Sequence, residues 1–130
     1  MRVLLDTHVW LWLQSEPERL SEASLEMLAN PANELLLSAA SAWEIAVKVG
    51  LGKLLLPAPP ADYVPRRLAT SGTTALPVEL RHALHVATLP RHHSDPFDRL
   101  LVAQAQVEGL PLMTADPQLG AYEVEILAAK

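Results

Sequence analysis

The pattern of apolar and polar residues predicts five short strands separated by helical sequence. The strands are expected at residues 3–5, 34–38, 73–76, 110–114 and 124–127. The helices are expected at 8–14, 22–29, 39–49, 61–70, 78–87 and 96–108. Because strands that alternate with helices form βαβ units, we predict an α/β fold, a three-layer α/β/α sandwich around a mostly parallel five-stranded sheet.

The boundaries of these elements rest on short local signals. The unbroken apolar run that ends at Leu5 is typical of a strand buried on both faces, and Thr7 is expected to cap the helix that follows. Ser21 is a good N-cap for the second helix. Asp95 and the proline after it open the last long helix, and Gly109 ends it.

Composition narrows the class of protein. The chain has 130 residues, enough for one domain with a real core, so residues 1–130 are predicted to form a single domain. It contains no cysteine, which fits a reducing cytoplasm, and no apolar run long enough for a membrane span. The net charge of −5 argues against the broad basic surface of an avid nucleic-acid binder.

Four acidic residues fall near one edge of the predicted sheet. Asp6 directly follows the first strand, and Asp116 follows the fourth. Glu44 lies on the helix after the second strand, and Asp98 lies in the first turn of the helix before the fourth. The carboxyl ends of parallel strands form the ligand-binding edge of open α/β sheets. We therefore expect the four side chains to converge there.

A convergence of carboxylates has a chemical consequence. Asp98 shares a helix face with the apolar residues Leu101 and Val102, which favours an inward orientation. Carboxylates brought together repel one another unless a cation neutralises them. Mg²⁺, or Mn²⁺ in its place, suits such an all-oxygen site and can activate water for hydrolysis of a phosphodiester.

Each acid also has a purely structural interpretation. Asp95 and Asp98 are well placed to cap their helix and to interact with its dipole. Glu44 can pair with Lys48, four residues later on the same helix. Asp116 precedes a proline, as residues that open turns often do. Taken singly these interpretations are the simpler ones, but the joint placement of the acids favours a site.

Four segments carry a family resemblance: LLDTHVWLW, SAASAWEIAVKVGLGKL, HHSDPFDRLLVAQAQVEGLPLMTAD and VEIL. They are spread over nearly the whole chain, and the combination is specific. On these residues the chain resembles PIN-domain ribonucleases of the VapC toxin type. The resemblance implies a PIN-like sandwich, a Mg²⁺-dependent endoribonuclease that leaves a 5′-phosphate, a VapB-type antitoxin partner and a homodimer.

The resemblance also assigns roles to residues. It implies that the metal is held by Asp6 and Asp98, which match the family's first and third acids, and that Asp116, which matches the fourth, completes the site directly or through water. Glu44 matches the second acid and would bind in the outer shell or hold a second ion. The small hydroxyl positions that support the acids match Thr7 and Thr114. Many relatives have Asn two residues after the first acid, where this chain has His8, whose role is left open.

Several other residues have two interpretations each. Arg99 could reach a phosphate, or form an ion pair that steadies the acids. His92 or His93 could contact substrate, whereas the spacing of the histidines matches no zinc pattern. Basic side chains that could guide RNA, or merely be solvated, are Lys48, Lys53, Arg66 and Arg67. Leucines that could form a groove for an antitoxin helix, or belong to the core, are Leu11, Leu13, Leu51, Leu54, Leu55 and Leu56.

Two other classes of function remain open on the sequence alone. A phosphatase or phospho-acceptor on a similar fold usually has a second acid beside the first, whereas Asp6 is followed by Thr7 and His8. A non-catalytic interaction module could use the same acids to bind a cation for stability. An RNA cleavage assay distinguishes a nuclease from these two alternatives.

Overall fold

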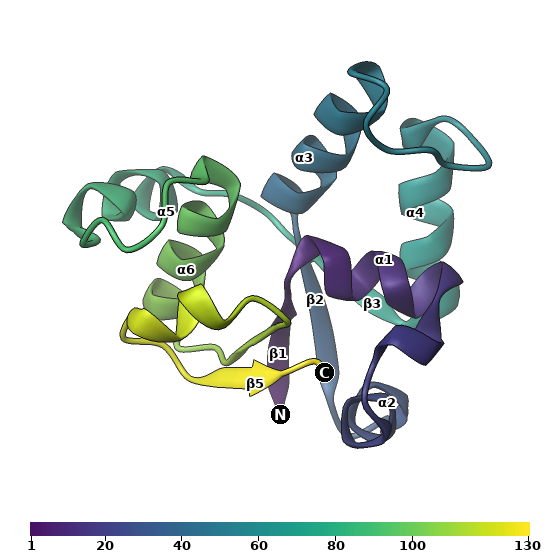
Figure 1. Cartoon of the computed structure of the whole chain (residues 1–130), viewed down its shortest axis with the longest axis horizontal. Coiled ribbons are helices and arrows are strands. Elements are labelled where there is room, and N and C mark those ends of the chain that lie inside the picture. Colours follow the sequence, from purple (N-terminus) through teal and green to yellow (C-terminus); the bar gives the residue numbers. More distant parts are fainter.

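All five predicted strands are present and form one parallel sheet in the computed structural model, which describes residues 1–130 (Figure 1). They are β1 (Arg2–Leu5), β2 (Glu34–Ser38), β3 (Thr73–Leu76), β4 (Leu112–Thr114) and β5 (Ile126–Ala128). Their order is β3-β2-β1-β4-β5, and every neighbouring pair is parallel. The predicted α/β class is confirmed.

Helices cover both faces of this sheet, which makes three layers. The longer helices are α1 (Thr7–Ser15), α2 (Glu22–Ala29), α3 (Ala39–Gly50), α4 (Pro60–Ser71), α5 (Leu80–His85) and α6 (Pro96–Glu108). Three short 3₁₀ turns are η1 (Pro17–Arg19), η2 (Val86–Thr88) and η3 (Pro117–Ala121). In Figure 1, α1 to α4 lie on one side of the strands and α5 and α6 on the other. A helix of the length and apolar character needed to cross a membrane is absent.

Side chains on the two faces of the strands belong to two separate hydrophobic cores. Val3 and Leu5 belong to the core under α1 to α4, whereas Leu4 belongs to the core under α6. All three side chains are fully buried, as an unbroken apolar strand requires. Each contributes roughly 1.5–3 kcal/mol of hydrophobic stabilisation. The sheet is therefore a well-anchored layer from whose edge polar side chains can be positioned.

Three predicted elements begin two residues later in the structure than the sequence indicates. The fourth strand begins at Leu112 and not at residue 110, because the Leu110 amide donates back to Ala105 of α6 and Pro111 has no N–H. The helix predicted at 78–87 is shorter, because Glu79 is the N-cap of α5 in a reciprocal capping arrangement with His82. The last strand begins two residues later and ends one residue later than predicted, at Ile126–Ala128.

The chain changes its direction of travel across the sheet beside β1. From β1 it passes through β2 to β3 at one edge, and then crosses back to β4 on the other side of β1. The Asp6 amide continues the pairing of β1 with β4 by donating to the Met113 carbonyl at 2.9 Å. Ligands of doubly wound sheets bind at such a switch point, outside the carboxyl ends of the strands. Asp6 and Asp116 follow these two strands, so the topology places them together.

Candidate metal centre

Asp6 is a buried carboxylate held from two sides. It has extended backbone angles and is the N-cap of α1, so the prediction that Thr7 caps this helix is wrong by one residue. Its Oδ1 accepts a hydrogen bond from the Thr7 amide at 2.7 Å, and its Oδ2 accepts one from Thr114 Oγ1, also at 2.7 Å. Only 5% of the residue is exposed, and this burial raises the pKa of the Asp6 carboxyl despite both hydrogen bonds.

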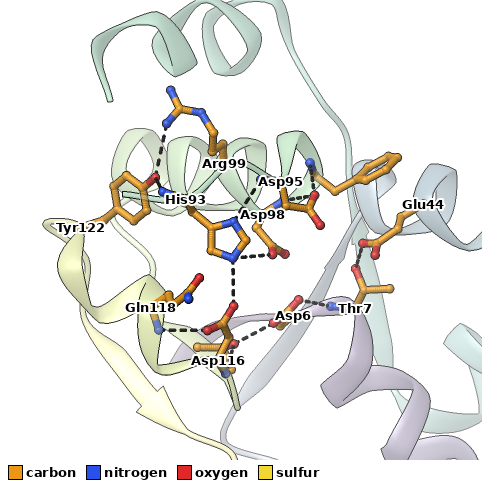
Figure 2. A network of polar contacts seen from close by, with 12 residues as sticks. Asp6, Thr7, Glu44, His93, Asp95, Asp98, Arg99, Asp116, Gln118 and Tyr122 are labelled. Atoms are coloured by element: carbon orange, nitrogen blue, oxygen red, sulfur yellow. Dashed lines mark hydrogen bonds and ion pairs between the residues drawn. The ribbon is translucent and has the colours of Figure 1, made fainter. Parts of the chain in front are cut away.

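Thr7 joins Asp6 to Glu44. The Thr7 hydroxyl donates to Glu44 Oε1 at 2.8 Å (Figure 2). It also lies 2.8 Å from the Ser41 hydroxyl. The other oxygen of Glu44 accepts from Lys48 Nζ at 2.5 Å, as the spacing on the helix predicted. Burial lowers the pKa of Lys48, but the hydrogen bond to Glu44 and its charge outweigh burial and raise it. Both carboxylate oxygens of this buried acid therefore have partners within the protein.

Asp98 is the acid with the most strongly perturbed ionisation. It lies in the first turn of α6, whose N-cap is Asp95, and the Asp95 carboxylate accepts from the amides of Phe97 and Asp98 at 2.8 and 3.4 Å. Burial raises the pKa of Asp98 to about 7, and the charges of Asp6, Asp95 and Glu44 contribute to the rise. The structural role predicted for Asp95 is confirmed, and it adds negative charge beside Asp98.

Asp116 completes the group from the end of β4. Its amide donates to Thr114 Oγ1 at 3.0 Å, so Thr114 contacts both Asp6 and Asp116. One oxygen of Asp116 accepts from the Gln118 amide at 2.9 Å, as in a turn that opens before proline. Figure 2 shows the Asp6, Asp98 and Asp116 carboxylates turned toward the same space. All four predicted acids thus lie within one connected region.

His93 is the member of the site whose contacts the sequence did not predict. Its Nε2 lies 3.0 Å from Asp116 Oδ2 and 3.5 Å from Asp98 Oδ2 (Figure 2). Its Nδ1 accepts a hydrogen bond from the Asp95 amide at 3.0 Å, which leaves the proton of a neutral ring on Nε2. The His93 backbone amide donates to the Tyr122 hydroxyl at 2.9 Å. The ring is therefore held as a donor toward two of the acids.

Arg99 does not take the role predicted from its place beside Asp98. Its guanidinium donates to the carbonyl oxygens of Val86, Leu89 and Pro90 and to the Tyr122 hydroxyl, at 2.9 to 3.4 Å. No carboxylate pairs with it, so of its two interpretations the ion pair with the acids is wrong, and contact with a phosphate stays a prediction. The reason is geometric, because neighbouring residues on a helix point in different directions. Arg99 instead ties the loop before α6 to that helix.

Two groups of side chains have the residue types and proximity of metal ligands. One is His93, Asp98 and Asp116, whose ligand atoms lie within 4.8 Å of one another.

The other group lies away from the sheet edge and consists of Glu79, His82 and Glu108. There, His82 Nδ1 accepts from the Glu79 amide at 2.9 Å and Nε2 pairs with Glu108 Oε1 at 2.8 Å, so both ring nitrogens are engaged. The hydrogen bond from His82 lowers the pKa of Glu108. This second group therefore holds α5 against α6.

The residues at the sheet edge fit a hard divalent cation. The acids offer oxygen donors, and Asp98 has a pKa raised to about 7 by its burial and its acidic neighbours, which is the repulsion that a cation would relieve. His93 is oriented by Asp95 as a donor and not as a nitrogen ligand. Mg²⁺ and Mn²⁺ favour oxygen ligands of this kind, whereas Zn²⁺ sites use nitrogen or sulfur.

Comparisons with known proteins agree with this geometry. The PIN domain family matches residues 3–125. Ribonuclease VapC22 of Mycobacterium tuberculosis is 33% identical over 120 residues, which cover 92% of this chain and 91% of that protein. Ribonuclease VapC16 of the same organism is 55% identical over 53 residues, which cover 41% of this chain and only 38% of that protein.

Solved structures share the fold over the full chain. VapBC2 from Rickettsia felis, solved bound to a DNA fragment from its promoter, contains a chain that superposes with a TM-score of 0.75 at 14% identity and 100% coverage of both chains. VapBC-5 from Mycobacterium tuberculosis gives a TM-score of 0.61 at 24% identity, covering 98% of both chains. The match to the family over nearly all of the sequence is decisive, and the chain belongs to the VapC-type PIN-domain ribonucleases.

Proposed function

We propose that this protein is a Mg²⁺-dependent endoribonuclease and the toxin of a VapBC-type toxin–antitoxin pair. The observation that carries the proposal is the convergence of Asp6, Asp98 and Asp116 at the switch point of the sheet (Figure 2). Its named relatives are ribonucleases. The proposed place of action is the cytoplasm, and Mn²⁺ is an acceptable substitute for Mg²⁺ at all-oxygen sites.

In this proposal Asp6, Asp98 and Asp116 hold the ion. When bound, the ion activates water and neutralises charge on the phosphoryl oxygens. Asp6 keeps its orientation because the Thr7 amide and Thr114 hydroxyl each bind one of its oxygens. Glu44 already has a protein partner on each oxygen, which favours an outer position for it.

Protein groups around the phosphodiester carry out the proton transfer from the attacking water. One of the carboxylates takes the proton from the attacking water, whose oxygen forms the new bond to phosphorus. The bond from phosphorus to the 3′ oxygen breaks, and that oxygen takes a proton from solvent water, which leaves a 5′-phosphate and a free 3′-hydroxyl. The Nε2–H of His93 lies beside Asp98 and Asp116, where it limits the repulsion between these two acids.

RNA cleavage tests the proposal directly. A single-stranded RNA is incubated with the wild-type protein in Mg²⁺ or in EDTA, and with Asp6→Asn and Asp98→Asn. Asp62→Asn, an exposed residue in the first turn of α4, is the matched control. We expect cleavage only in Mg²⁺, with both site variants reduced at least 100-fold, since such electrostatic groups contribute about 10²–10³ to rates. Cleavage in EDTA, or full activity of both site variants, contradicts the proposal.

The same assay decides between the nuclease and the two other classes. Asp6 is a poor phospho-acceptor because it is buried and both of its oxygens accept hydrogen bonds. If a covalent acyl-phosphate is nevertheless trapped at Asp6, the protein is a phosphatase. If Mg²⁺ raises the melting temperature of the protein but no RNA is cleaved, the protein is a non-catalytic interaction module.

An apolar groove supports the proposal of a VapB-type partner. A cavity of about 350 Å³ lies between α1 and the segment after α3, and its apolar lining includes Leu11, Trp12, Leu54, Leu55, Leu56 and Tyr63. Leu55 is 91% exposed, which is costly for a leucine without a partner. Of the leucines predicted for this groove, Leu13 and Leu51 do not line it. We expect Leu55→Glu to weaken co-purification with a VapB-type antitoxin that the wild-type protein retains.

Homodimer formation is also part of the proposal. Leu80 and Leu84 lie four residues apart on α5 and are 76% and 65% exposed, so a second copy could bury them. Light scattering of the wild-type protein and of Leu84→Glu measures the oligomeric state. If the wild-type protein is a monomer at micromolar concentration, the homodimer proposal is contradicted and the nuclease proposal is unaffected.

A further inference from the structure

A second pocket has Thr7, the residue after Asp6, in its wall. It has a volume of about 270 Å³ and lies between α1 and the carboxyl end of α3. We name it the basic pocket, after the residues that line it: Thr7, His8, Leu11, Ile45, Lys48, Lys53 and Leu54. Three of these residues carry basic side chains, and Thr7 forms part of the wall toward the acids.

The end of α3 builds the basic side of this pocket. Gly52 has a left-handed backbone with φ of 72°, and its amide donates to Val49 at 3.1 Å. The Lys53 amide then donates back to the Lys48 carbonyl at 2.9 Å, which completes a Schellman turn. The turn brings two lysines that are five residues apart to one cavity. Cations are also favoured there by the negative end of the helix dipole.

The pocket has more positive charge than its acidic partners neutralise. Lys48 pairs with Glu44, but no carboxylate pairs with Lys53 or His8, and both are exposed. Two of the chain's three lysines line this cavity, although the whole chain has a net charge of −5. The Lys53 backbone ends α3, but its exposed side chain makes no hydrogen bond or ion pair within the protein, so its charge is available to a ligand.

We propose that the basic pocket binds the RNA phosphate next to the one that is cleaved. This inference rests on the proposed nuclease function. RNA carries a phosphate at every nucleotide, so a phosphodiester placed at the acids brings the neighbouring phosphate close to them. Thr7 provides the connection, since its amide donates to Asp6 and its hydroxyl to Glu44 while it lines the pocket. Lysine ammonium groups are common phosphate ligands.

The assignment gives an acidic nuclease a way to hold a polyanion. Asp6, Asp98 and Asp116 would hold the ion that neutralises the scissile phosphate, and the basic pocket supplies attraction to the flanking one. His8, whose role the sequence left open, lies at the border of the basic pocket and the apolar groove. An acidic group of a protein partner is the competing occupant, because the two cavities share His8, Leu11 and Leu54.

Charge removal at Lys53 tests the inference. Lys53→Gln, Lys53→Arg and the control Arg66→Gln, an exposed cation on α4 outside both cavities, are compared with wild type on a single-stranded RNA in Mg²⁺. We expect Lys53→Gln to raise KM about five- to tenfold with kcat within about twofold, as for loss of one phosphate contact. The slope of log KM against log salt should fall by about 0.7. Lys53→Arg and Arg66→Gln should behave as wild type.

The outcomes distinguish this inference from the proposed function. If wild type cleaves RNA but Lys53→Gln leaves KM and its salt dependence unchanged, the phosphate assignment is overturned and the pocket is left to a protein partner. If wild type does not cleave RNA, the nuclease proposal fails first. The pocket is then tested by fluorescence anisotropy of a labelled oligoribonucleotide in EDTA, where equal affinity of wild type and Lys53→Gln overturns the assignment as well.

Discussion

Replacing Asp98 with Asn removes the carboxyl whose pKa is about 7, and we expect the metal-free protein to become more stable as a result. The unfolded chain ionises this carboxyl near 3.8, whereas the folded protein holds its proton up to about 7. Between these values the folded state binds more protons, so the free energy of unfolding of the wild type falls as pH rises and is constant above about pH 7. Asn cannot ionise, so the Asp98→Asn variant does not lose this part of its free energy of unfolding as pH rises.

The magnitude follows from the same shift. From pH 5 to pH 7 the loss is at most roughly 2.7 kcal/mol, at about 1.36 kcal/mol per pH unit. Solvent screens a partly exposed carboxyl, and 16% of the Asp98 side chain is accessible. We therefore expect the stabilisation of Asp98→Asn over wild type to grow by about 1–2 kcal/mol between pH 5 and pH 8.

Urea denaturation in EDTA at pH 5 and pH 8 measures this difference. Glu26→Gln, which removes an exposed acid of α2, is the matched control and should show no such growth. Adding Mg²⁺ at pH 8 should stabilise wild type more than Asp98→Asn, because the ion relieves the repulsion that the variant lacks. An Asp98→Asn stabilisation that is equal at both pH values refutes the electrostatic account of the cluster.

Three further substitutions test how the site and its helix are held. Thr114→Val should lower the free energy of unfolding by about 1–2 kcal/mol, because it leaves Asp6 without one of its donors; thermal unfolding measures this. Tyr122→Phe should cost about 1 kcal/mol in urea denaturation, since its hydroxyl contacts the segment before α6. Gly109→Ala should cost about 1 kcal/mol because φ is 65°, whereas Gly50→Ala, inside α3, should be neutral or stabilising.

The order of elements could be predicted because the local signals agree with the fold. The capped helix at Glu22–Ala29 and the strands at Glu34–Ser38 and Thr73–Leu76 have the predicted bounds. The fourth strand could not be bounded correctly, because its start depends on the hydrogen bond of Leu110 to α6. Such a contact is decided by how the helix end packs, which periodicity does not describe.

The acids could be placed in one region because the carboxyl ends of parallel strands share an edge. The location of Asp6 could be predicted from its position directly after β1 alone. The contacts of His93 could not be predicted, because they depend on the loop between η2 and α6, where the Tyr122 hydroxyl fixes its backbone. The direction of Arg99 was likewise decided by carbonyl groups of that loop.

The central claim is that Asp6, Asp98 and Asp116 together hold a divalent ion. Anomalous diffraction from crystals soaked in Mn²⁺ measures this most directly, with crystals of Asp98→Asn as the comparison. The account predicts an anomalous peak within coordinating distance of these three carboxylates in wild type, and loss of that peak in the variant. Well-diffracting wild-type crystals with no peak there, or a peak that persists unchanged in Asp98→Asn, would contradict it.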